Sequence, residues 1–314
     1  MHQHVIQSPE WGRFKTEYGT TSHTAGKIQY TTHEIPLTNY RFAYAPKISS
    51  FDINWDELKA SLIKNRCVAI NLDVPDIIKG TSDETKALEK ITKVGLRKPP
   101  RDTFAKYNVL LDIAKPEKDL LSQLHTKHRY NLRYAQKQGV TVELGESMED
   151  FEKFYTLFAQ TAVRQKYYIH PKPYYEKIWK IFKPLDIAHI VTASHNEVPI
   201  ASWMLFTYKH VMYYPYGGSD ENYKNLQAST LVGWEAIKLG RSTECNLFDM
   251  WGAARDPENK KDSWYGFTNF KLRFGGTHVE YMDSYDFVIN DVYYNAFNTA
   301  NNLRWKLLKL RKLI

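Results

Sequence analysis

The chain has 314 residues and a mass of 36.8 kDa, a length that predicts two domains of about 150 residues or one large domain. Apolar residues make up 43% and charged residues 25% of the sequence, which excludes disordered, collagen-like and low-complexity proteins. The net charge of +8 attracts nucleic acid, phosphorylated metabolites or an anionic membrane, although a mild excess of this kind also serves solubility alone.

Cysteine use and hydrophobic segments restrict the cellular compartment. Cys67 and Cys245 are the only cysteines. They are too few for a disulfide framework and fit a reducing compartment. Residues 1–4 contain no apolar run of the kind found in a secretory signal. No segment approaches the ~20 apolar residues that a membrane-spanning helix needs. We therefore expect a cytoplasmic protein.

The N-terminal third predicts alternating strands and helices. Ser8 and Pro9 form a helix start signal, because serine caps free amide groups and proline fits the first turn. Pro75 ends a compact strand, since proline cannot extend a hydrogen-bonded ladder. Alternation and helical spacing predict strands at 27–32, 40–44, 68–73 and 108–113, and helices at 54–64 and within 79–101.

One long helix is predicted between Pro116 and Gly139, residues typical of a helix start and stop. An apolar stripe at helical spacing contains Leu121, Leu124, His128, Leu132 and Ala135. Arg129, Arg133 and Lys137 are four residues apart and form a second line on the same helix. The segment is therefore amphipathic, with a cationic line beside its apolar stripe.

The second half continues with both kinds of element. Strands are predicted at 140–144, 189–195, 199–208, 211–216, 247–250 and 278–287, and helices at 147–162, 174–182, 226–239, 267–274 and 292–313. Strand-rich segments interleaved with helices, in two similar sets, predict an α/β or α+β protein with two domains. The order in the second half resembles the N-acetyltransferase-like fold.

No motif for a nucleotide cofactor or a metal ion stands out. The segment 216–219 lacks the spacing of a phosphate-binding loop, and no Gly-x-Ser-x-Gly elbow occurs. His125 and His128 are three residues apart, a spacing that two metal ligands can use, but no third ligand with suitable spacing follows. Since His128 also lies on the apolar stripe, we predict a core histidine, with no metal and no cofactor.

The sequence K-H-R-Y-N-L-R-Y-A-Q-K-Q-G-V at residues 127–140 resembles the signature helix of the Fem-type (FemABX) aminoacyltransferases. Further segments resemble the same family in the same order: 11–15 (W-G-R-F-K), 213–219 (Y-Y-P-Y-G-G-S), 234–238 (W-E-A-I-K), 248–252 (F-D-M-W-G) and 267–276 (F-T-N-F-K-L-R-F-G-G). These segments extend over almost the whole chain. The sequence is therefore identified as a member of this family, one without the coiled-coil arm that some members carry.

The resemblance implies two tandem N-acetyltransferase-like (GNAT) domains, residues 1–113 joined by the C-terminal helix 290–314, and residues 114–289. Fem-type enzymes transfer an amino acid from aminoacyl-tRNA to an amine of the peptidoglycan stem peptide, which builds the interpeptide bridge. The acceptor is UDP-MurNAc-pentapeptide or a lipid-linked muropeptide, and neither a metal nor acetyl-CoA is used. We therefore expect an aminoacyl-tRNA-dependent aminoacyltransferase that acts as a monomer.

Lys271 is the candidate catalytic residue. The resemblance places a lysine at this position near the 3′ end of the tRNA, where a cation would stabilise the oxyanion of the tetrahedral intermediate. The alternative is a surface lysine on an amphipathic helix. The residues expected to bind the muropeptide are Arg13, Lys15, Asp73, Lys172, Tyr213 and Tyr216. Among them, the carboxylate of Asp73 is expected to orient the acceptor amine. For Asp73 a turn residue is the alternative, and for Tyr216 a core ring at a strand end.

Two basic segments are expected to contact larger partners. Arg129, Arg133 and Lys137 would bind phosphates of the tRNA acceptor stem, with a solvated helix face as the alternative. The segment 305–314 is basic and amphipathic. It would contact the inner face of an anionic membrane as a peripheral surface, or pack against its own domain.

The resemblance is incomplete on the muropeptide side, and two other functions stay open. Residues 47–49 (K-I-S) stand where the family often has Gly-Pro. Lys172 stands where an arginine is expected, and Arg13, with Lys15 nearby, where a lysine is expected. One alternative function is a GNAT-fold N-acyltransferase that moves an acyl group from acyl-CoA or another acyl donor to a small amine. It would need a glycine turn for the pyrophosphate, and none is found. The other is a non-catalytic RNA- or membrane-binding module.

Overall fold

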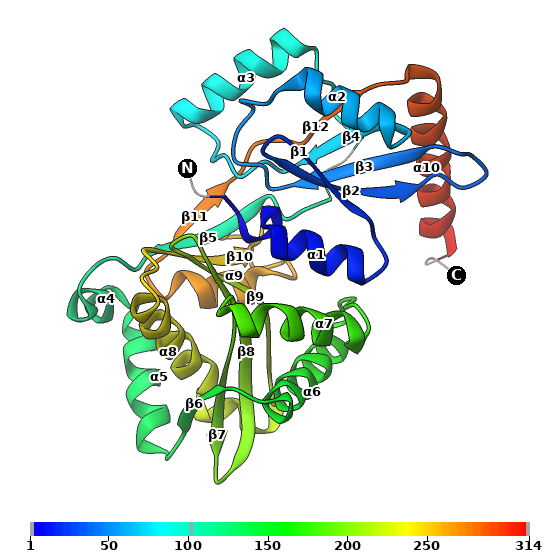
Figure 1. The fold of residues 1–314 in the computed structure, drawn as a ribbon. Helices are drawn as coiled ribbons and strands as arrows, with labels where there is room; N and C mark the ends of the chain where they lie inside the picture. Colours follow the sequence, from blue (N-terminus) through cyan, green and yellow to red (C-terminus); the bar gives the residue numbers. More distant parts are fainter. Residues whose placement is uncertain (1–2, 101–102, 312–314) are drawn as a thin grey trace. The chain divides into compact units, whose positions relative to one another are not determined.

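The structure is a computed structural model that describes residues 3–100 and 103–311, with side chains up to residue 304. It consists of two compact units. Unit 1 contains Gln3–Lys106 and the segment from Tyr281 onward, and unit 2 contains Tyr107–Glu280. Each unit is built on its own sheet with helices packed against it (Figure 1). The predicted α/β class is therefore confirmed.

Unit 1 is built on a five-stranded sheet in the order β1-β2-β3-β4-β12. Its strands are β1 (Ser22–Ala25), β2 (Ile28–Glu34), β3 (Arg41–Pro46), β4 (Cys67–Asp73) and β12 (Tyr285–Val288). Its helices are η1 (Val5–Gln7), α1 (Pro9–Glu17), α2 (Trp55–Lys64), α3 (Ser82–Val94) and α10 (Asp291–Arg311). All strand pairs are antiparallel except β3 with β4, which α2 connects.

Unit 2 is built on a seven-stranded sheet in the order β11-β5-β10-β9-β8-β7-β6. Its strands are β5 (Tyr107–Asp112), β6 (Thr141–Gly145), β7 (Ala188–His195), β8 (Val198–Tyr208), β9 (Val211–Ser219), β10 (Leu247–Gly252) and β11 (Thr277–Glu280). Its helices are α4 (Glu117–Gln123), α5 (Thr126–Lys137), α6 (Met148–Gln165), α7 (Lys172–Phe182), η2 (Lys183–Leu185), η3 (Glu221–Leu226), α8 (Ala228–Ser242) and α9 (Tyr265–Leu272).

The two units repeat one topological feature. In unit 2 the single parallel pair is β9 with β10, and α8 connects the two strands. This strand–helix–strand crossover matches β3–α2–β4 of unit 1. In unit 2, α6 covers one face of the sheet, whereas α8 covers the opposite face with α5 beside it (Figure 1). The sheet of unit 2 is thus enclosed on both sides, and its core includes Trp203, Phe248 and Phe274.

The unit boundaries differ from the expected ones at residues 113 and 289. Strand β5 pairs with β10 and β11, so residues 107–113 belong to unit 2. The segment 278–287, predicted as a single strand, contains two strands in different sheets. β11 pairs with β5 in unit 2, whereas β12 pairs with β4 in unit 1. Alternating hydrophobicity continues through this segment, and it carries no signal for the change of sheet.

The long helix predicted from Pro116 to Gly139 is wrong in one respect, because it is two helices. Leu124 has ψ near 136°, which ends α4. The side chain of His125 then accepts a hydrogen bond from the amide of Lys127 and caps α5. The break also changes the register of the apolar stripe, so that Leu121 is exposed.

The prediction of a core histidine at position 128 is confirmed. His128 is 1% exposed, and its Nε2–H donates to the carbonyl oxygen of Phe270 at 3.0 Å. Burial lowers the pKa of His128 to about 4. Among the described residues, no helix is sufficiently long and apolar to cross a membrane. The side chains of the basic C-terminal segment, 305–314, lie outside the described residues.

Candidate active site

The end of strand β10 positions the candidate catalytic lysine. The pairing of β10 with β5 shifts register between Asp249 and Gly252, and Trp251 has a left-handed backbone with φ of 65°. A bulge of this kind turns a strand and redirects its backbone groups. The carbonyl oxygen of Gly252 accepts a hydrogen bond of 2.7 Å from Nζ of Lys271. Strained non-glycine residues of this kind cluster at functional sites.

Helix α9 brings Lys271 to this position. Thr268 and Lys271 are three residues apart, so both side chains point to the same side of the helix, and both are fully buried. Oγ1 of Thr268 accepts a hydrogen bond from the amide of Ala254 at 2.7 Å. The carbonyl of Phe270 is held by His128 of α5. The helix is therefore fixed on both sides of the lysine.

Aromatic rings complete the surroundings of the ammonium group. Nζ of Lys271 lies 3.7 Å from the ring centre of Phe267 and 5.6 Å from that of Tyr214. Lys271 is 0% exposed, whereas Phe267 is 44% exposed. One half-exposed ring thus covers the lysine, and cation–π attraction offsets part of the cost of removing its charge from water.

Burial and one carboxylate act in opposite directions on the lysine. Desolvation holds the pKa of Lys271 well below its usual value, and the nearby carboxylate of Asp249 raises it in part. Asp249 is 2% exposed and accepts hydrogen bonds from Asn108 Nδ2 at 2.8 Å and from the amide of Trp251 at 2.7 Å. Sequence reasoning gave no role to Asp249 or Phe267. The signal that could have indicated Asp249 was an acidic residue in the middle of a strand that is otherwise apolar.

A second group of predicted residues meets in an aromatic cluster of unit 2. The ring of Tyr216 contacts Tyr175 at 5.0 Å between centroids, and Tyr175 contacts Tyr155 at 6.0 Å. Lys172, at the start of α7, lies 5.9 Å from the Tyr155 ring and pairs with Glu152 at 2.6 Å. Burial raises the pKa of Tyr216 well above its usual value. The cluster therefore connects Tyr216 and Lys172 through two intervening rings.

Close packing explains the Y-x-Y-G-G-S segment. A Cβ on Gly218 would lie 2.3 Å from the backbone of Leu157 in α6, and one on Gly217 would lie 2.4 Å from the hydroxyl of Tyr214. Only glycine permits these approaches of β9. Tyr213 is 2% exposed, with its ring 6.1 Å from that of Trp251 in an edge-to-face arrangement. Its side chain packs beside the bulge of β10.

The other predicted residues of the muropeptide group lie in unit 1. Arg13 is exposed on α1 and pairs with Glu17 at 2.8 Å. Lys15 is half-buried, with its pKa lowered by burial. Asp73 is fully buried at the end of β4. Its carboxylate accepts four hydrogen bonds, from the hydroxyls of Tyr44 and Ser284 and from the amides of Thr103 and Phe104. This arrangement favours the turn role that the sequence left open for Asp73.

The three cations of α5 have different surroundings. The guanidinium of Arg129 donates to the carbonyl oxygens of Ser122 and Leu124, both at 2.7 Å, and thereby caps the C-terminus of α4. Arg133 and Lys137 are exposed. Arg129 therefore holds α4 and α5 together. Its guanidinium is engaged by these carbonyl groups, which neither the expected phosphate contact nor the alternative of a solvated side chain describes.

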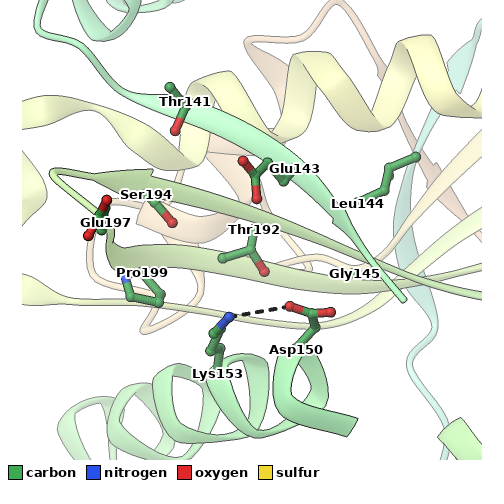
Figure 2. A pocket seen from close by; sticks show the side chains of 10 residues that line it. All are labelled: Thr141, Glu143, Leu144, Gly145, Asp150, Lys153, Thr192, Ser194, Glu197 and Pro199. Atoms are coloured by element: carbon green, nitrogen blue, oxygen red, sulfur yellow. Dashed lines mark hydrogen bonds and ion pairs between the residues drawn. The ribbon is translucent and has the colours of Figure 1, made fainter. Parts of the chain in front are cut away.

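A cleft of about 230 Å³ lies elsewhere in unit 2, where β6 and β7 face the start of α6 (Figure 2). Its lining consists of Thr141, Glu143, Leu144, Gly145, Asp150, Lys153, Thr192, Ser194, Glu197 and Pro199. Lys153 Nζ lies 3.5 Å from Asp150 Oδ1, and Asp150 itself caps α6. None of the predicted site residues lines this cleft. Among the described residues, no group of three or more His, Cys, Asp or Glu side chains is arranged to hold a metal ion.

Each of the two sheets contains the same kind of strand–helix–strand crossover, and this repeat defines a tandem N-acetyltransferase-like protein. Known structures have the same fold. The crystal structure of FemX superposes with a TM-score of 0.82 at 17% sequence identity, covering 95% of each chain. The structure of L-PGS from Bacillus licheniformis superposes with a TM-score of 0.57 at 10% identity, covering 95% of this chain and 96% of that one. At these identities the similarity establishes the fold.

The chain belongs to the FemAB family. The model of this family matches residues 56–194 and 185–302, which together make up most of the chain. This match confirms the Fem-type membership indicated by the signature helix and the ordered segments.

Curated relatives of known name share less than 30% sequence identity with this chain, over part of its length. Aminoacyltransferase FemA of Staphylococcus epidermidis is 28% identical over 111 residues, 35% of this chain and 26% of that protein. The UDP-N-acetylmuramoylpentapeptide-lysine N(6)-alanyltransferase of Weissella viridescens is 24% identical over 189 residues, 60% of this chain and 54% of that protein. The matched part of this chain therefore spans between about a quarter and about half of these curated relatives.

Proposed function

We propose that this protein is an aminoacyltransferase of peptidoglycan synthesis, which moves an amino acid from aminoacyl-tRNA to an amine of a precursor stem peptide. Membership of the FemAB family supports this proposal, as do the transferase names of its relatives in Staphylococcus epidermidis and Weissella viridescens. The observation that carries it is the buried Lys271, fixed between the bulge of β10 and two aromatic rings. The donor places the reaction in the cytoplasm.

The proposed reaction needs no covalent enzyme intermediate, because an aminoacyl ester is already activated. The acceptor amine attacks the ester carbonyl carbon, and a C–N bond forms as the carbonyl oxygen becomes an oxyanion. Collapse of this intermediate breaks the C–O bond, and the proton of the amine ends on the departing ribose oxygen. The enzyme contributes position and a cation for the oxyanion.

Lys271 is suited to the second task. Desolvation keeps its pKa low, so its ammonium form gains strongly when a negative charge develops nearby in a dry site. Its hydrogen bond to the Gly252 carbonyl and the fixed helix α9 hold the group in one place. Little reorganisation is then needed when the oxyanion forms.

The muropeptide contacts belong to the same proposal. Lys172 and Tyr216 of the aromatic cluster would contact the diphosphate and sugar of UDP-MurNAc-pentapeptide or the lipid-linked equivalent. Arg13 and Lys15 of α1 are separate candidates for phosphate contacts on unit 1. Lys172 and Arg13 would exchange exposed ion pairs for phosphate, and exposed pairs are weak. Tyr213 is buried and would support Tyr216 from the same strand. Asp73 would position the segment that contains Thr103 and Phe104.

The decisive experiment measures transfer of a labelled amino acid from aminoacyl-tRNA to UDP-MurNAc-pentapeptide and to a lipid-linked acceptor. We expect Lys271→Met to lower kcat by about 10²–10³-fold, as the loss of one oxyanion donor does. The matched control is Lys153→Met, which changes a lysine of unit 2 in the separate cleft and should keep full activity.

Two outcomes would contradict the proposal. Undiminished transfer by the Lys271→Met protein would reject the role of this lysine. Acylation of a small amine by acyl-CoA, with no transfer from aminoacyl-tRNA, would reject the donor and favour the N-acyltransferase alternative.

A further inference from the structure

Helix α5 lies in a long part of unit 2 without negative charge. No acidic residue occurs in the sequence between Asp119 and Glu143. The helix itself carries Lys127, Arg129, Arg133 and Lys137. Because solvated helix faces usually mix both signs of charge, a helix with cations alone creates a positive surface that favours polyanions.

The inner face of α5 is committed to holding the helix in place. His128, Asn131, Leu132 and Ala135 are buried. Nδ2 of Asn131 donates to Oε1 of Gln227 at 2.8 Å, and His128 holds the backbone of α9. Arg129 caps α4, as described above. These residues account for much of the family signature, and they leave the opposite side of the helix for other contacts.

The outer face combines the remaining cations with two stacked tyrosines. It consists of Lys127, Tyr130, Arg133, Tyr134 and Lys137, which we call the α5 face. The rings of Tyr130 and Tyr134 lie 5.9 Å apart with 18° between their planes, and Tyr130 is 60% exposed. Among the described side chains, no carboxylate pairs with the three cations of this face. The helix lies beside α8, away from the α6 side of the sheet (Figure 1).

We propose that the α5 face binds RNA, with its three cations on phosphates and an unpaired base stacked on Tyr130. The identity of the RNA as a tRNA rests on the proposed function. Every base has a flat face, so an exposed ring accepts unpaired nucleotides of any sequence. The face extends about 15 Å along the helix, since ten residues rise by 1.5 Å each.

The composition of the α5 face favours RNA over a membrane. A helix that binds a lipid surface presents large aliphatic and aromatic side chains along one side and inserts them between acyl chains. Here the buried side is already occupied, and the exposed side offers two tyrosines among cations. Stacked rings with hydroxyl groups and interleaved cations match the planar bases and phosphates of single-stranded RNA.

The test measures binding of the full-length protein to a hairpin RNA with a four-nucleotide 3′ overhang. We expect Tyr130→Ala to weaken this binding about tenfold and Tyr130→Phe to preserve it, because stacking needs the ring alone. Arg133→Gln and Lys137→Gln should each reduce the slope of log affinity against log salt by about 0.7, the value for one lost phosphate contact on a single strand.

Matched controls separate the face from general surface effects. Tyr168→Ala removes a tyrosine that is 86% exposed outside α5, and Lys59→Gln removes an exposed cation of unit 1. Both variants should bind the overhang hairpin as the unchanged protein does. Tyr130, Arg133 and Lys137 are exposed, so circular dichroism of their variants should match that of the unchanged protein.

Three outcomes would overturn the inference. The first is unchanged RNA affinity in the Tyr130→Ala protein. The second is an equal loss for a blunt hairpin, which would mean that no unpaired base is involved. The third is RNA binding that persists in the Arg133→Gln and Lys137→Gln proteins while binding to anionic lipid vesicles disappears, which would assign the face to a membrane.

Failure of the inference and failure of the proposed function give different results. Lys271→Met should lower kcat of transfer by about 10²–10³-fold and keep RNA affinity. If transfer is absent but the α5 variants lose RNA binding, the proposed function fails and the RNA face stands. If transfer and RNA affinity are both unaffected by Tyr130→Ala, the face fails and the proposed function stands.

Discussion

Each unit contains a lysine that is completely removed from solvent, and the two have different surroundings. Lys47 of unit 1 and Lys271 of unit 2 are both 0% exposed, and each ammonium lies over an aromatic ring. The ring over Lys47 is Tyr281, at 3.2 Å, and it is itself 3% exposed. The ring over Lys271 is Phe267, which is 44% exposed.

The second difference concerns charge. Lys47 has the carboxylate of Asp76 at 4.0 Å, whereas the hydrogen-bond acceptor of Lys271 is a neutral carbonyl. A cation beside a carboxylate and under a buried ring is typical of a structural contact. A cation under a half-exposed ring can become accessible to a ligand when the side chain of that ring rotates. Burial alone therefore does not distinguish a reactive lysine from a structural one. The exposure of the aromatic ring that covers the lysine does distinguish them.

The largest expected effect is a stability change of opposite sign in two matched variants. Lys271→Met should raise the free energy of unfolding at pH 7, because desolvation disfavours the buried ammonium and only one hydrogen bond, to the carbonyl of Gly252, is lost. Lys47→Met should lower it by about 1–2 kcal/mol, through loss of the buried cation–π contact. Urea unfolding of both full-length variants measures the difference.

The pH dependence of this stability has a definite sign. Between the lowered pKa of folded Lys271 and the usual value near 10.4, the unfolded chain binds more protons, so stability rises with pH in this window. The rise should be absent in the Lys271→Met protein. Equal changes of stability in the two lysine variants would break the comparison.

A smaller effect is expected from the histidine behind Lys271. The pKa of His128 is about 4 in the folded protein, so the unfolded chain binds more protons between pH 6.5 and 4. Stability should therefore fall by about 2 kcal/mol as the pH is lowered through this window. In the His128→Gln protein the slope should flatten, since the amide donates to Phe270 without titrating. His195→Gln serves as the control, and an identical slope in all three proteins would contradict the assignment.

The smallest expected effect tests the cover itself. Phe267→Ala should increase the rate at which an amine-selective reagent modifies Lys271 by about tenfold, because the half-exposed ring is removed. The rate at Lys47 should stay unchanged in the same protein, which provides an internal control. Peptide mass spectrometry reports both positions. An equal rate at Lys271 with and without the ring would show that other groups exclude the reagent.

Much of the fold followed from patterns within short segments. The meander of β7, β8 and β9 and the crossover helix α8 were predicted because alternation and helical spacing are local properties. Strand β1 and the break between α4 and α5 were missed. β1 has four residues with only one buried, and the break depends on the side chain of His125 capping α5. Neither leaves a periodic signal.

The site followed from the sequence to a smaller extent. The resemblance selected Lys271, but nothing in the spacing indicated that Phe267 would cover it or that Asp249 would lie nearby. Arg129 was grouped with Arg133 because both lie on one helical line. The carbonyl groups that Arg129 caps are exposed only because the chain leaves the helix at Leu124. Contacts between segments that are distant in the sequence could not be predicted from local patterns.

The return of the chain to its first sheet has a consequence for synthesis on the ribosome. Unit 2 is continuous from Tyr107 to Glu280, whereas the sheet of unit 1 lacks β12 until residues 285–288 have left the exit tunnel. The N-terminal strands must therefore wait, with the edge of β4 uncovered, while the inserted unit is translated and folds. Nascent chains that stall before Tyr285 would leave this edge unpaired, and an unpaired strand edge is a site at which chains pair wrongly and aggregate.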